Sequence, residues 1–305
     1  MIDSRTLVVG ADSRIGGALL RARGAAIGTT RRRETLSSTR LFLDLSQDVE
    51  HFKIPSDVDS AFLVAATTGI ERCETDPTSW TVNVTSACRL SARLLQQGCF
   101  VTFLSTNAVF GGDRSWPDED DPVAPTAAYA RQKAEAEQAI QEAADRLGAA
   151  DRLSITRLTK TLAPDTPPLP GWFQQLKRGD AIEPFEDLVM SPISLEFVTS
   201  SLLRIGALRV PGILHLSGER DVTYVEFAEG LIDRLGLPRA RVVPTTSIKA
   251  GVAVQFRPRY GGLGMRRTTQ LAQIYPEPLE HVTAHLNDRR ADGAGGSKNA
   301  LESSR

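Results

Sequence analysis

The first βα turn of this chain is the feature that most constrains its fold. An apolar strand, TLVVG, runs directly into the segment ADSRIGG and then into the start of a helix. Gly10 and Gly16 take the outer places of a G-x-x-G-x-x-G pattern, and Ser13 takes the middle place with a small side chain and an added hydroxyl. Such a turn brings backbone amides and a helix N-terminus close to a pyrophosphate. An ordinary tight turn is the alternative, but the position behind the first apolar strand favours a dinucleotide site.

Strand-like and helix-like segments alternate along the first half of the chain. The further strand candidates are AAIGTT, LFLDL, SAFLVAA, CFVTFLST and RLSITRLTK, and the helices between them include TSWTVNVTSACRLSARLLQQG. Alternation with few hairpin signals predicts an α/β fold, a Rossmann-type doubly wound parallel sheet. Residues 1–160 are therefore predicted to form an NAD(P)-binding Rossmann domain.

The regular alternation of strand-like and helix-like segments ends near residue 160. A proline-rich loop precedes a short helix, GWFQQLKRG, and the segment TYVEFAEGLIDRLG reads as an amphipathic helix with Thr223 as its N-cap. Residues 161–289 are predicted to form a smaller α/β substrate-binding region, with segments such as GILHLSG returning to the sheet. Residues 290–305 are small, polar and aperiodic, and are expected to be disordered.

The composition argues against several classes of partner. The 305 residues carry a formal net charge of −1, which gives no bulk attraction to nucleic acid. No apolar run reaches the roughly 18 residues that suggest a membrane span, and the first strand leaves no room for a signal peptide, so a cytoplasmic protein is expected. The thiols and imidazoles lack the spacing of a metal site, and none is assigned to Cys73, Cys88, Cys99, His51, His215, His281 or His285.

The end of the second strand bears on the choice between NAD and NADP. Thr29 and Thr30 end that strand and residues 31–33 are all arginine, with no carboxylate to accept from an adenosine ribose. A guanidinium there favours a 2′-phosphate, so NADP(H) is favoured over NAD(H). The alternative is a solvated basic turn. Asp44, at the end of the third strand, would lie beside the adenine.

Tyr129 and Lys133 lie four residues apart at the start of a predicted helix, which places a phenol and an ammonium on one face. A free tyrosine has a pKa of about 10, and a fixed positive charge nearby would lower it and suit the phenol to acid catalysis. Ser105 and Thr106 end the fifth strand, so a hydroxyl could meet that phenol. The spacing alone occurs by chance in many helices, and it gains weight from the nucleotide-binding N-terminus.

Six motifs in this order resemble the extended short-chain dehydrogenase/reductase superfamily, and within it the dTDP-4-dehydrorhamnose reductase branch of nucleotide-sugar proteins. They are GADSRIG, VAATTGIERCETDP, VNVTSACRLSARLLQQG, FLSTNAVFGG, AYARQKAEAE and FRPRYGGLGM, and the resemblance covers roughly residues 5 to 287. It implies a catalytic set of Thr106, Tyr129 and Lys133. It also implies that Asn83 supports the lysine through structure or water.

The resemblance implies a role for each member of that set. Tyr129 would donate a proton to a carbonyl oxygen, and Lys133 would lower the phenol's pKa and bind the nicotinamide ribose. Thr106 would donate to the same carbonyl oxygen. Without the family, Thr106 reads as a strand-end cap and Asn83 as a buried helix amide bonded to backbone.

The rest of the implied site follows the strand ends and the loops beyond them. The cofactor contacts would be Gly10, Ser13, Arg14, Ile15, Gly16, Thr29, Arg31, Arg32, Asp44, Leu45, Ala65, Ala66, Thr67, Ser105, Tyr129 and Lys133. The substrate contacts would be Thr106, Asn107, Ala108, Trp172 and Arg257. Trp172 also reads as a packing tryptophan and Arg257 as a surface arginine in a salt bridge. Asn107 and Ala108 replace an acidic and an aromatic residue of many family reductases, so the identity of the sugar stays open.

Three functions are compatible with these residues. The leading one is an NADPH-dependent reductase of a nucleotide-activated 4-keto-6-deoxy sugar. The second is a nucleotide-sugar epimerase or dehydratase of the same superfamily, which many relatives mark with acidic residues that are missing here. The third is a non-catalytic, dinucleotide-binding regulatory subunit, which has no need of the full catalytic set. A nucleotide sugar is the expected partner, nucleic acid and membrane are not, and a homodimer is left open.

Overall fold

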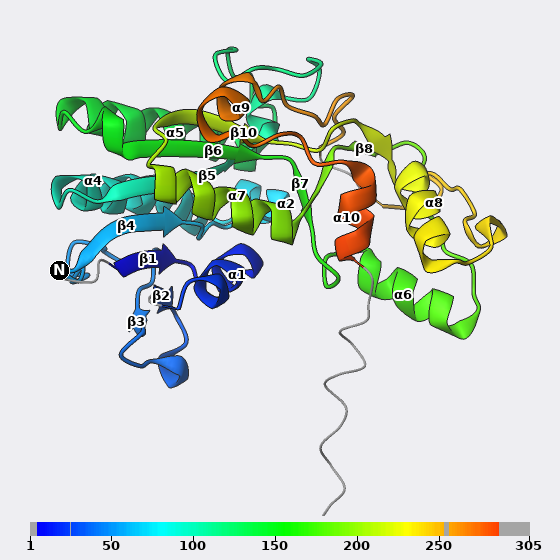
Figure 1. Ribbon diagram of the computed structural model, residues 1–305, viewed down its shortest axis with the longest axis horizontal. Coiled ribbons are helices and arrows are strands. Elements are labelled where there is room, and N and C mark those ends of the chain that lie inside the picture. Colours follow the sequence, from blue (N-terminus) through cyan, green and yellow to red (C-terminus); the bar gives the residue numbers. More distant parts are fainter. Residues whose placement is uncertain (1–4, 25, 253–255, 287–305) are drawn as a thin grey trace, which may run out of the picture.

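A seven-stranded parallel sheet forms the centre of the molecule (Figure 1). The computed structural model describes residues 5–24, 26–252 and 256–286. The strand order is β10-β6-β5-β4-β1-β2-β3. The strands are β1 (Arg5–Val9), β2 (Ile27–Thr30), β3 (Arg40–Phe42), β4 (Val58–Leu63), β5 (Phe100–Thr106), β6 (Leu153–Leu158) and β10 (Gly212–Leu216). This confirms the predicted Rossmann-type α/β fold.

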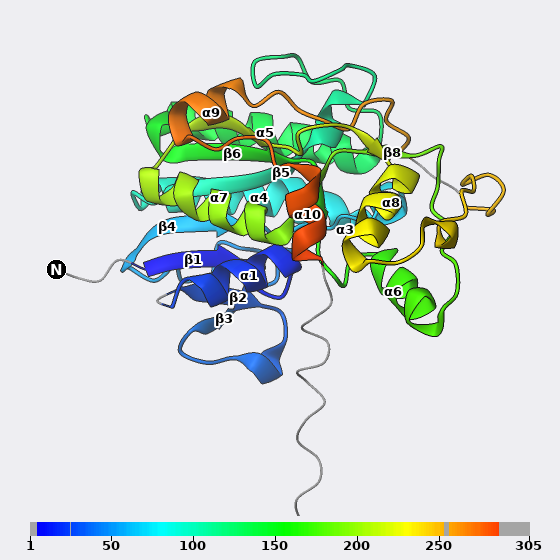
Figure 2. The same ribbon diagram turned by 45° about the vertical axis from the view of Figure 1, so that its right-hand side comes forward.

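Helices cover both faces of the sheet, so its strands are almost entirely buried. α1 (Arg14–Ala22) and α7 (Leu195–Leu208) lie on one face, and α4 (Ala87–Gln96) and α5 (Ala128–Arg146) lie on the other (Figure 2). The alternation of strand side chains decides on which side of the sheet each residue packs. In β1, Leu7 and Val9 pack with the α4 and α5 side, whereas Val8 packs with the α1 and α7 side.

The chain order of the strands places the site. From β1 the chain runs outward through β2 and β3, then crosses back to continue with β4, β5, β6 and β10 on the other side of β1. Ligands of open α/β sheets bind where the strand order reverses, beyond the carboxyl ends of the strands. The turn after β1 lies at that switch point, between β2 and β4.

Several shorter elements complete the first half of the chain. They are α2 (Ile70–Thr75), α3 (Thr78–Trp80), the π-helical turn η2 (Thr81–Ser86), and the 3₁₀ turns η1 (Arg33–Thr35), η3 (Asn107–Phe110) and η4 (Ala150–Arg152). The segment predicted as one long helix is thus α3, η2 and α4 in succession. Wide π turns inside helices often occur at functional sites, and this one carries Asn83.

A second core lies beyond residue 160. α6 (Leu169–Arg178), α8 (Tyr224–Leu235) and α10 (Leu279–His285) surround it, and two small sheets pair β8 (Val189–Met190) with β11 (Val222–Thr223) and β7 (Lys160–Leu162) with β9 (Pro192–Ser194). η5 (Arg239–Arg241) and α9 (Arg266–Ala272) follow, and α9 packs near β10. Segments after residue 160 therefore contribute to both cores. The division at residue 160 stays a prediction, and the tail predicted from residue 290 lies outside the described residues.

Thr223 caps α8 as predicted. Its hydroxyl accepts a hydrogen bond from the Glu226 amide at 3.1 Å, and the Glu226 carboxylate accepts one from the Thr223 amide at 2.7 Å. This reciprocal pair is a capping box, which fixes where the helix begins. None of the helices in the described ranges combines the length and the apolar composition that a membrane span requires.

Candidate active site

The turn after β1 is as tight as glycine permits. Gly10 has φ +95°, and a Cβ there would lie 2.7 Å from the Cβ of Ala65. A Cβ on Gly16 would lie 2.2 Å from the carbonyl oxygen of Gly10. The two predicted glycines therefore allow β1, α1 and the loop after β4 to meet at one point, which is the cradle that a dinucleotide pyrophosphate requires.

Ser13 closes this turn in place of the middle glycine. Its hydroxyl donates to the Gly10 carbonyl at 2.8 Å and accepts from the Gly16 amide at 3.0 Å, so it is the N-cap of α1. The other amides of the first helical turn belong to Arg14 and Ile15. Those are the groups that a helix N-terminus offers to phosphate, so the residues present fit a dinucleotide.

Replacing Gly16 by alanine is expected to lower the free energy of unfolding by about 2 kcal/mol or more and to abolish dinucleotide binding. The reason is the overlap of the new methyl group with the Gly10 carbonyl. Gly17→Ala is the matched control, because a Cβ there meets only a flexible Arg21 nitrogen at 3.3 Å and an Ala11 oxygen at 3.5 Å. Urea unfolding and NADPH fluorescence measure the two effects. Equal binding by both variants would contradict the prediction.

Contrary to the expectation from sequence, a carboxylate does lie at the end of β2. It belongs to Asp12, in the glycine turn after β1. The buried Thr30 hydroxyl donates to Asp12 at 2.7 Å, and the other Asp12 oxygen pairs with Arg40 at 3.1 Å. The sequence showed no acidic residue after the second strand, because Asp12 reaches that place only through the pairing of β1 with β2. Its charge is already shared between a hydroxyl and a guanidinium.

The three arginines after β2 differ in their surroundings. The Arg33 guanidinium lies 4.2 Å from the centroid of the Phe42 ring. The side chains of Arg31 and Arg32 are exposed, and neither makes a hydrogen bond or ion pair with a residue that the structure describes. The two arginines predicted to meet the cofactor are therefore the two whose guanidinium groups remain unpaired.

α5 packs along β5 and carries Tyr129 and Lys133. Tyr129 is half-buried, whereas the exposed fraction of Lys133 is 2%. The Lys133 ammonium lies 3.7 Å from the centroid of the Phe103 ring in β5. It makes no hydrogen bond or ion pair within the described ranges, which is unusual for a buried cation.

The pKa values of this pair correct the expectation from spacing alone. Burial raises the pKa of Tyr129, and the nearby Cys73 thiol raises it further. Burial lowers the pKa of Lys133 to about 7, against the field of the Glu137 carboxylate. The ammonium therefore does not hold the phenol's pKa down, because desolvation acts on both groups more strongly than they act on each other. At neutral pH the phenol is therefore protonated.

The two hydroxyls at the end of β5 have different partners. Thr106 accepts from the Ala108 amide at 3.2 Å and donates to the Asn107 amide oxygen at 3.4 Å, which caps η3. The buried Ser105 hydroxyl has no partner among the residues described. Strand alternation places Ser105 on the face of Phe103, toward α5. Both predicted donors thus reach the same strand end, and Ser105 is the one without a competing bond.

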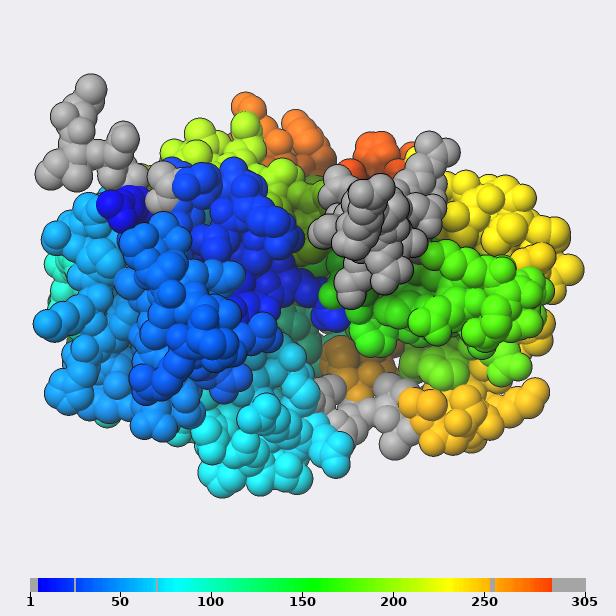
Figure 3. All heavy atoms as spheres, turned by 90° about the horizontal axis from the view of Figure 1, so that it is seen from below, coloured from blue at the N-terminus to red at the C-terminus, as the bar shows by residue number. Residues whose placement is uncertain are grey.

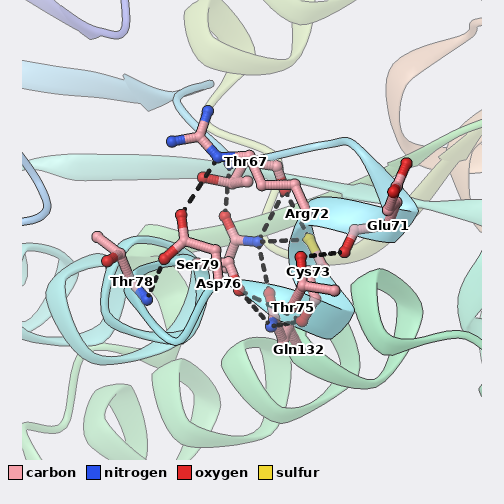
Figure 4. Close-up of polar contacts among 10 residues, drawn as sticks. Thr67, Glu71, Arg72, Cys73, Thr75, Asp76, Thr78, Ser79 and Gln132 are labelled. Carbon is pink, nitrogen blue, oxygen red and sulfur yellow. Dashed lines mark hydrogen bonds and ion pairs between the residues drawn. The ribbon is translucent and has the colours of Figure 1, made fainter.

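Asn83 connects the loop after β4 to α5. Its side chain accepts from the Thr67 amide at 2.8 Å and donates to the Thr67 carbonyl at 2.9 Å and to Gln132 at 2.7 Å. Gln132 in turn donates to Ser79 at 2.9 Å (Figure 4). Asn83 has no hydrogen bond to Lys133 in the described part of the chain, and its bond to α5 is the one to the Gln132 side chain, next to the lysine.

Gln132 is a residue that the sequence reasoning missed. It is buried, it lies directly before Lys133, and it joins α5 to both η2 and α2 through Asn83 and the Cys73 carbonyl. A polar residue at an inward helical position was the only signal for it. Figure 4 shows Cys73 and Ser79 on the side of the cluster that faces Gln132.

The remaining predicted cofactor contacts lie along the same edge of the sheet. Asp44 accepts from the Ser46 amide at 3.0 Å, and Leu45 is buried. Arg14 binds Asp165 with 2.8 Å between Nε and Oδ2, which joins the glycine turn to the loop before α6. Seen from below, the N-terminal half and the region of α6 and α8 stand on either side of a hollow (Figure 3).

The predicted substrate contacts divide into two groups. Asn107 donates to the Gly261 carbonyl at 2.8 Å, and Ala108 is buried beside it, so both lie in the loop beyond β5. Trp172 is instead buried in the second core, where its ring centroid lies 6.4 Å from that of Phe227. Arg257 forms an ion pair with Asp187 at 3.0 Å.

Among the residues that the structure describes, no group of three or more His, Cys, Asp or Glu side chains is placed to hold a metal ion.

Comparison with known proteins gives the family. A model described as the RmlD substrate binding domain matches residues 4–290. A probable low-salt glycan biosynthesis reductase Agl14 from Haloferax volcanii is 29% identical over 184 residues, which are 59% of this chain and 61% of that protein. A probable dTDP-4,6-dihydroxy-2-methyloxan-3-one 4-ketoreductase from Streptomyces antibioticus is 30% identical over 210 residues, 67% of this chain and 68% of that protein.

Solved structures share the fold. The dTDP-4-dehydrorhamnose reductase from Bacillus anthracis, in complex with NADP, has a TM-score of 0.75 at 19% identity, over 93% of this chain and 98% of that one. MoeE5 in complex with UDP-glucose and NAD has a TM-score of 0.74 at 22% identity, over 95% of this chain and 99% of that one. With the match to the family model and the glycine turn, the chain belongs to the RmlD substrate binding domain family, in the dTDP-4-dehydrorhamnose reductase-like branch of the extended short-chain dehydrogenases/reductases.

Proposed function

We propose that this protein is an NADPH-dependent reductase of a nucleotide-activated 4-keto-6-deoxy sugar. The observation that carries the proposal is the Lys133 ammonium over the Phe103 ring of β5, with Tyr129 one helical turn earlier on α5, in a sheet whose glycine turn lies at the switch point. The relative from Streptomyces antibioticus bears the name of a probable dTDP-sugar 4-ketoreductase, which supports a nucleotide-bound ketone as the substrate class.

The residues of the site would divide the chemistry as follows. A bound nicotinamide supplies the hydride that reduces the ketone carbon. Tyr129 gives its phenolic proton to the ketone oxygen, and the raised pKa keeps that proton in place until negative charge develops on the oxygen. Lys133 would offset part of the negative charge that the phenol gains, without outweighing the burial that raises the phenol's pKa. Ser105 and Thr106 offer hydroxyl donors at the strand end.

The preference for NADPH is part of the proposal and has its own test. Arg31 and Arg32 stand exposed and unpaired within the described chain, beside a carboxylate already bound by Thr30 and Arg40. Replacing both arginines by alanine is expected to weaken NADPH binding about 10- to 100-fold, the range of one or two charge-assisted hydrogen bonds, and to leave NADH binding unchanged. Arg33→Ala is the control, since that guanidinium stacks on Phe42. Equal affinity of the original protein for NADPH and NADH would contradict this preference.

Turnover decides the proposed activity. Purified protein with NADPH is offered dTDP-, GDP- and UDP-linked 4-keto-6-deoxy sugars, and oxidation of NADPH is followed by absorbance. The expected result is saturable oxidation with at least one of them and formation of the corresponding alcohol. Tight dinucleotide binding without turnover on any of these sugars would contradict a reductase and favour a binding role.

A further inference from the structure

A buried ion pair lies one helical turn beyond the catalytic lysine. Glu137 follows Lys133 by four residues in α5 and meets Arg157 of β6. The guanidinium Nε lies 3.2 and 3.1 Å from the two carboxylate oxygens, and NH2 lies 2.6 Å from Oε2. The side chains are 3% and 4% exposed, so this bidentate contact is almost fully withdrawn from water.

Arg157 is fixed from two further sides. Its NH1 lies 3.4 Å from Nε2 of His215, and its Cζ lies 4.9 Å from the centroid of the Phe110 ring. His215 Nδ1 lies 2.7 Å from the Gly264 carbonyl and therefore carries the proton, which leaves Nε2 to accept from Arg157. Burial and the charge of Arg157 lower the pKa of His215 to about 3, so the imidazole is neutral.

Lys133 and Glu137 would otherwise be partners. A lysine and a glutamate four residues apart on a helix are neighbours on one face and commonly form an ion pair. Here both oxygens of Glu137 are occupied by Arg157, and the Lys133 ammonium rests on the Phe103 ring instead. The charge of the Glu137 carboxylate raises the pKa of Lys133, but the hydrogen bonds of that carboxylate are to Arg157.

We propose that Arg157 is a positioning residue for Lys133: by binding both oxygens of Glu137 it withholds that carboxylate, so the ammonium stays unpaired and directed at the cofactor and Tyr129. The inference rests on the proposed role of Lys133. It extends the site beyond the tyrosine and lysine to β6 and β10, through Arg157 and His215.

The groups around Lys133 fit this arrangement. Tyr129 on the same helix is neutral, and so is Cys73 on α2, which acts on the phenol, since burial raises the pKa of each. Glu137 is the charged group that raises the pKa of Lys133 against its burial, and Arg157 is the cation that holds Glu137. Removing Glu137 is therefore expected to lower the pKa of Lys133, and removing Arg157 is expected to raise it.

Three variants test the inference: Arg157→Met, Glu137→Gln and the double variant. The chain has six lysines, so a ¹³C NMR titration of the lysine Cε can follow Lys133, which Lys133→Arg assigns. Arg157→Met frees Glu137 to pair with Lys133 and is expected to raise the lysine's pKa by about one unit or more and to lower kcat about tenfold or more. Glu137→Gln is expected to lower that pKa and to move the basic limb of the kcat profile to lower pH.

The double variant separates positioning from packing. With no carboxylate left to capture the lysine, it is expected to recover turnover relative to Arg157→Met and to titrate like Glu137→Gln. An unchanged Lys133 pKa in Arg157→Met, or a double variant as slow as Arg157→Met, would overturn the inference. If Arg157→Met does not fold, Arg157→Lys frees one carboxylate oxygen and should shift the pKa in the same direction by less. No shift in that variant would overturn it equally.

The NMR titration needs no turnover, so the two proposals can fail separately. Opposite pKa shifts without turnover on any sugar would contradict the reductase and support the arrangement of Arg157 and Glu137. Turnover with a Lys133 pKa that ignores both substitutions would support the reductase and contradict the inference.

Discussion

Replacing Tyr129 by phenylalanine is expected to reduce the rate of ketone reduction by about 10²- to 10⁴-fold, the range for loss of a positioned general acid. In the proposed reaction the phenol is the proton donor, and its raised pKa means that the proton is present across the neutral range. Dinucleotide affinity should stay nearly unchanged, since the glycine turn and the strand ends remain intact. A loss in kcat with an unchanged dissociation constant for NADPH is therefore the signature.

Tyr224→Phe is the matched control for this substitution. Tyr224 begins α8, packs against the second core, and also has a pKa raised by burial. It has no part in the proposed site, so its variant should reduce the ketone at the original rate. Single-turnover measurement of NADPH oxidation compares the two variants. If Tyr129→Phe reduces the ketone as fast as Tyr224→Phe does, Tyr129 is not the acid.

The sheet could be predicted from sequence because its signals are local. Apolar runs such as TLVVG and CFVTFLST are buried on both faces of the sheet. The glycines of the first turn stand where a Cβ would overlap neighbouring atoms. The long helix was predicted too simply, since nothing in its residue spacing marks the π turn around Asn83. That turn depends on bonds to Thr67 and Gln132, which are distant in the chain.

The site was predictable where function follows from spacing within one segment. Tyr129 and Lys133 lie on one helix, and the amides at the start of α1 follow from Gly10 and Gly16. The pKa direction of Tyr129 was not predictable, because it depends on how deeply the packed helix buries the phenol.

Two ion pairs could not be predicted from the sequence, because each depends on how the elements pack. Asp12 meets Arg40 only because β1, β2 and β3 are adjacent in the sheet. Glu137 meets Arg157 only because α5 packs over β6. Each contact joins residues at least 20 positions apart, and no local pattern marks such a pair.

Lys133→Met is expected to raise the free energy of unfolding at pH 6 by roughly 2–4 kcal/mol while it abolishes turnover. Lys133 is a buried cation with no anionic partner in the described chain, and burial lowers its pKa from 10.5 to about 7. Below pH 7 the folded protein must keep this ammonium charged without water, so the destabilisation is fully present there. Methionine has a similar shape and no charge, and it can rest on the Phe103 ring.

The direction of this effect can be read from how the free energy of unfolding changes with pH. Between the folded pKa of about 7 and the ordinary value of 10.5, the unfolded chain binds the proton that the folded chain has lost. The contribution of Lys133 to the free energy of unfolding therefore rises with pH across that interval. Urea unfolding at pH 6 and at pH 9 should show a difference between Lys133→Met and the original protein that shrinks at the higher pH. A variant that is less stable at pH 6, or a difference that does not change with pH, would mean that the ammonium is compensated. A gain in stability joined to a loss of turnover would instead show that the lysine is kept unpaired for its chemistry.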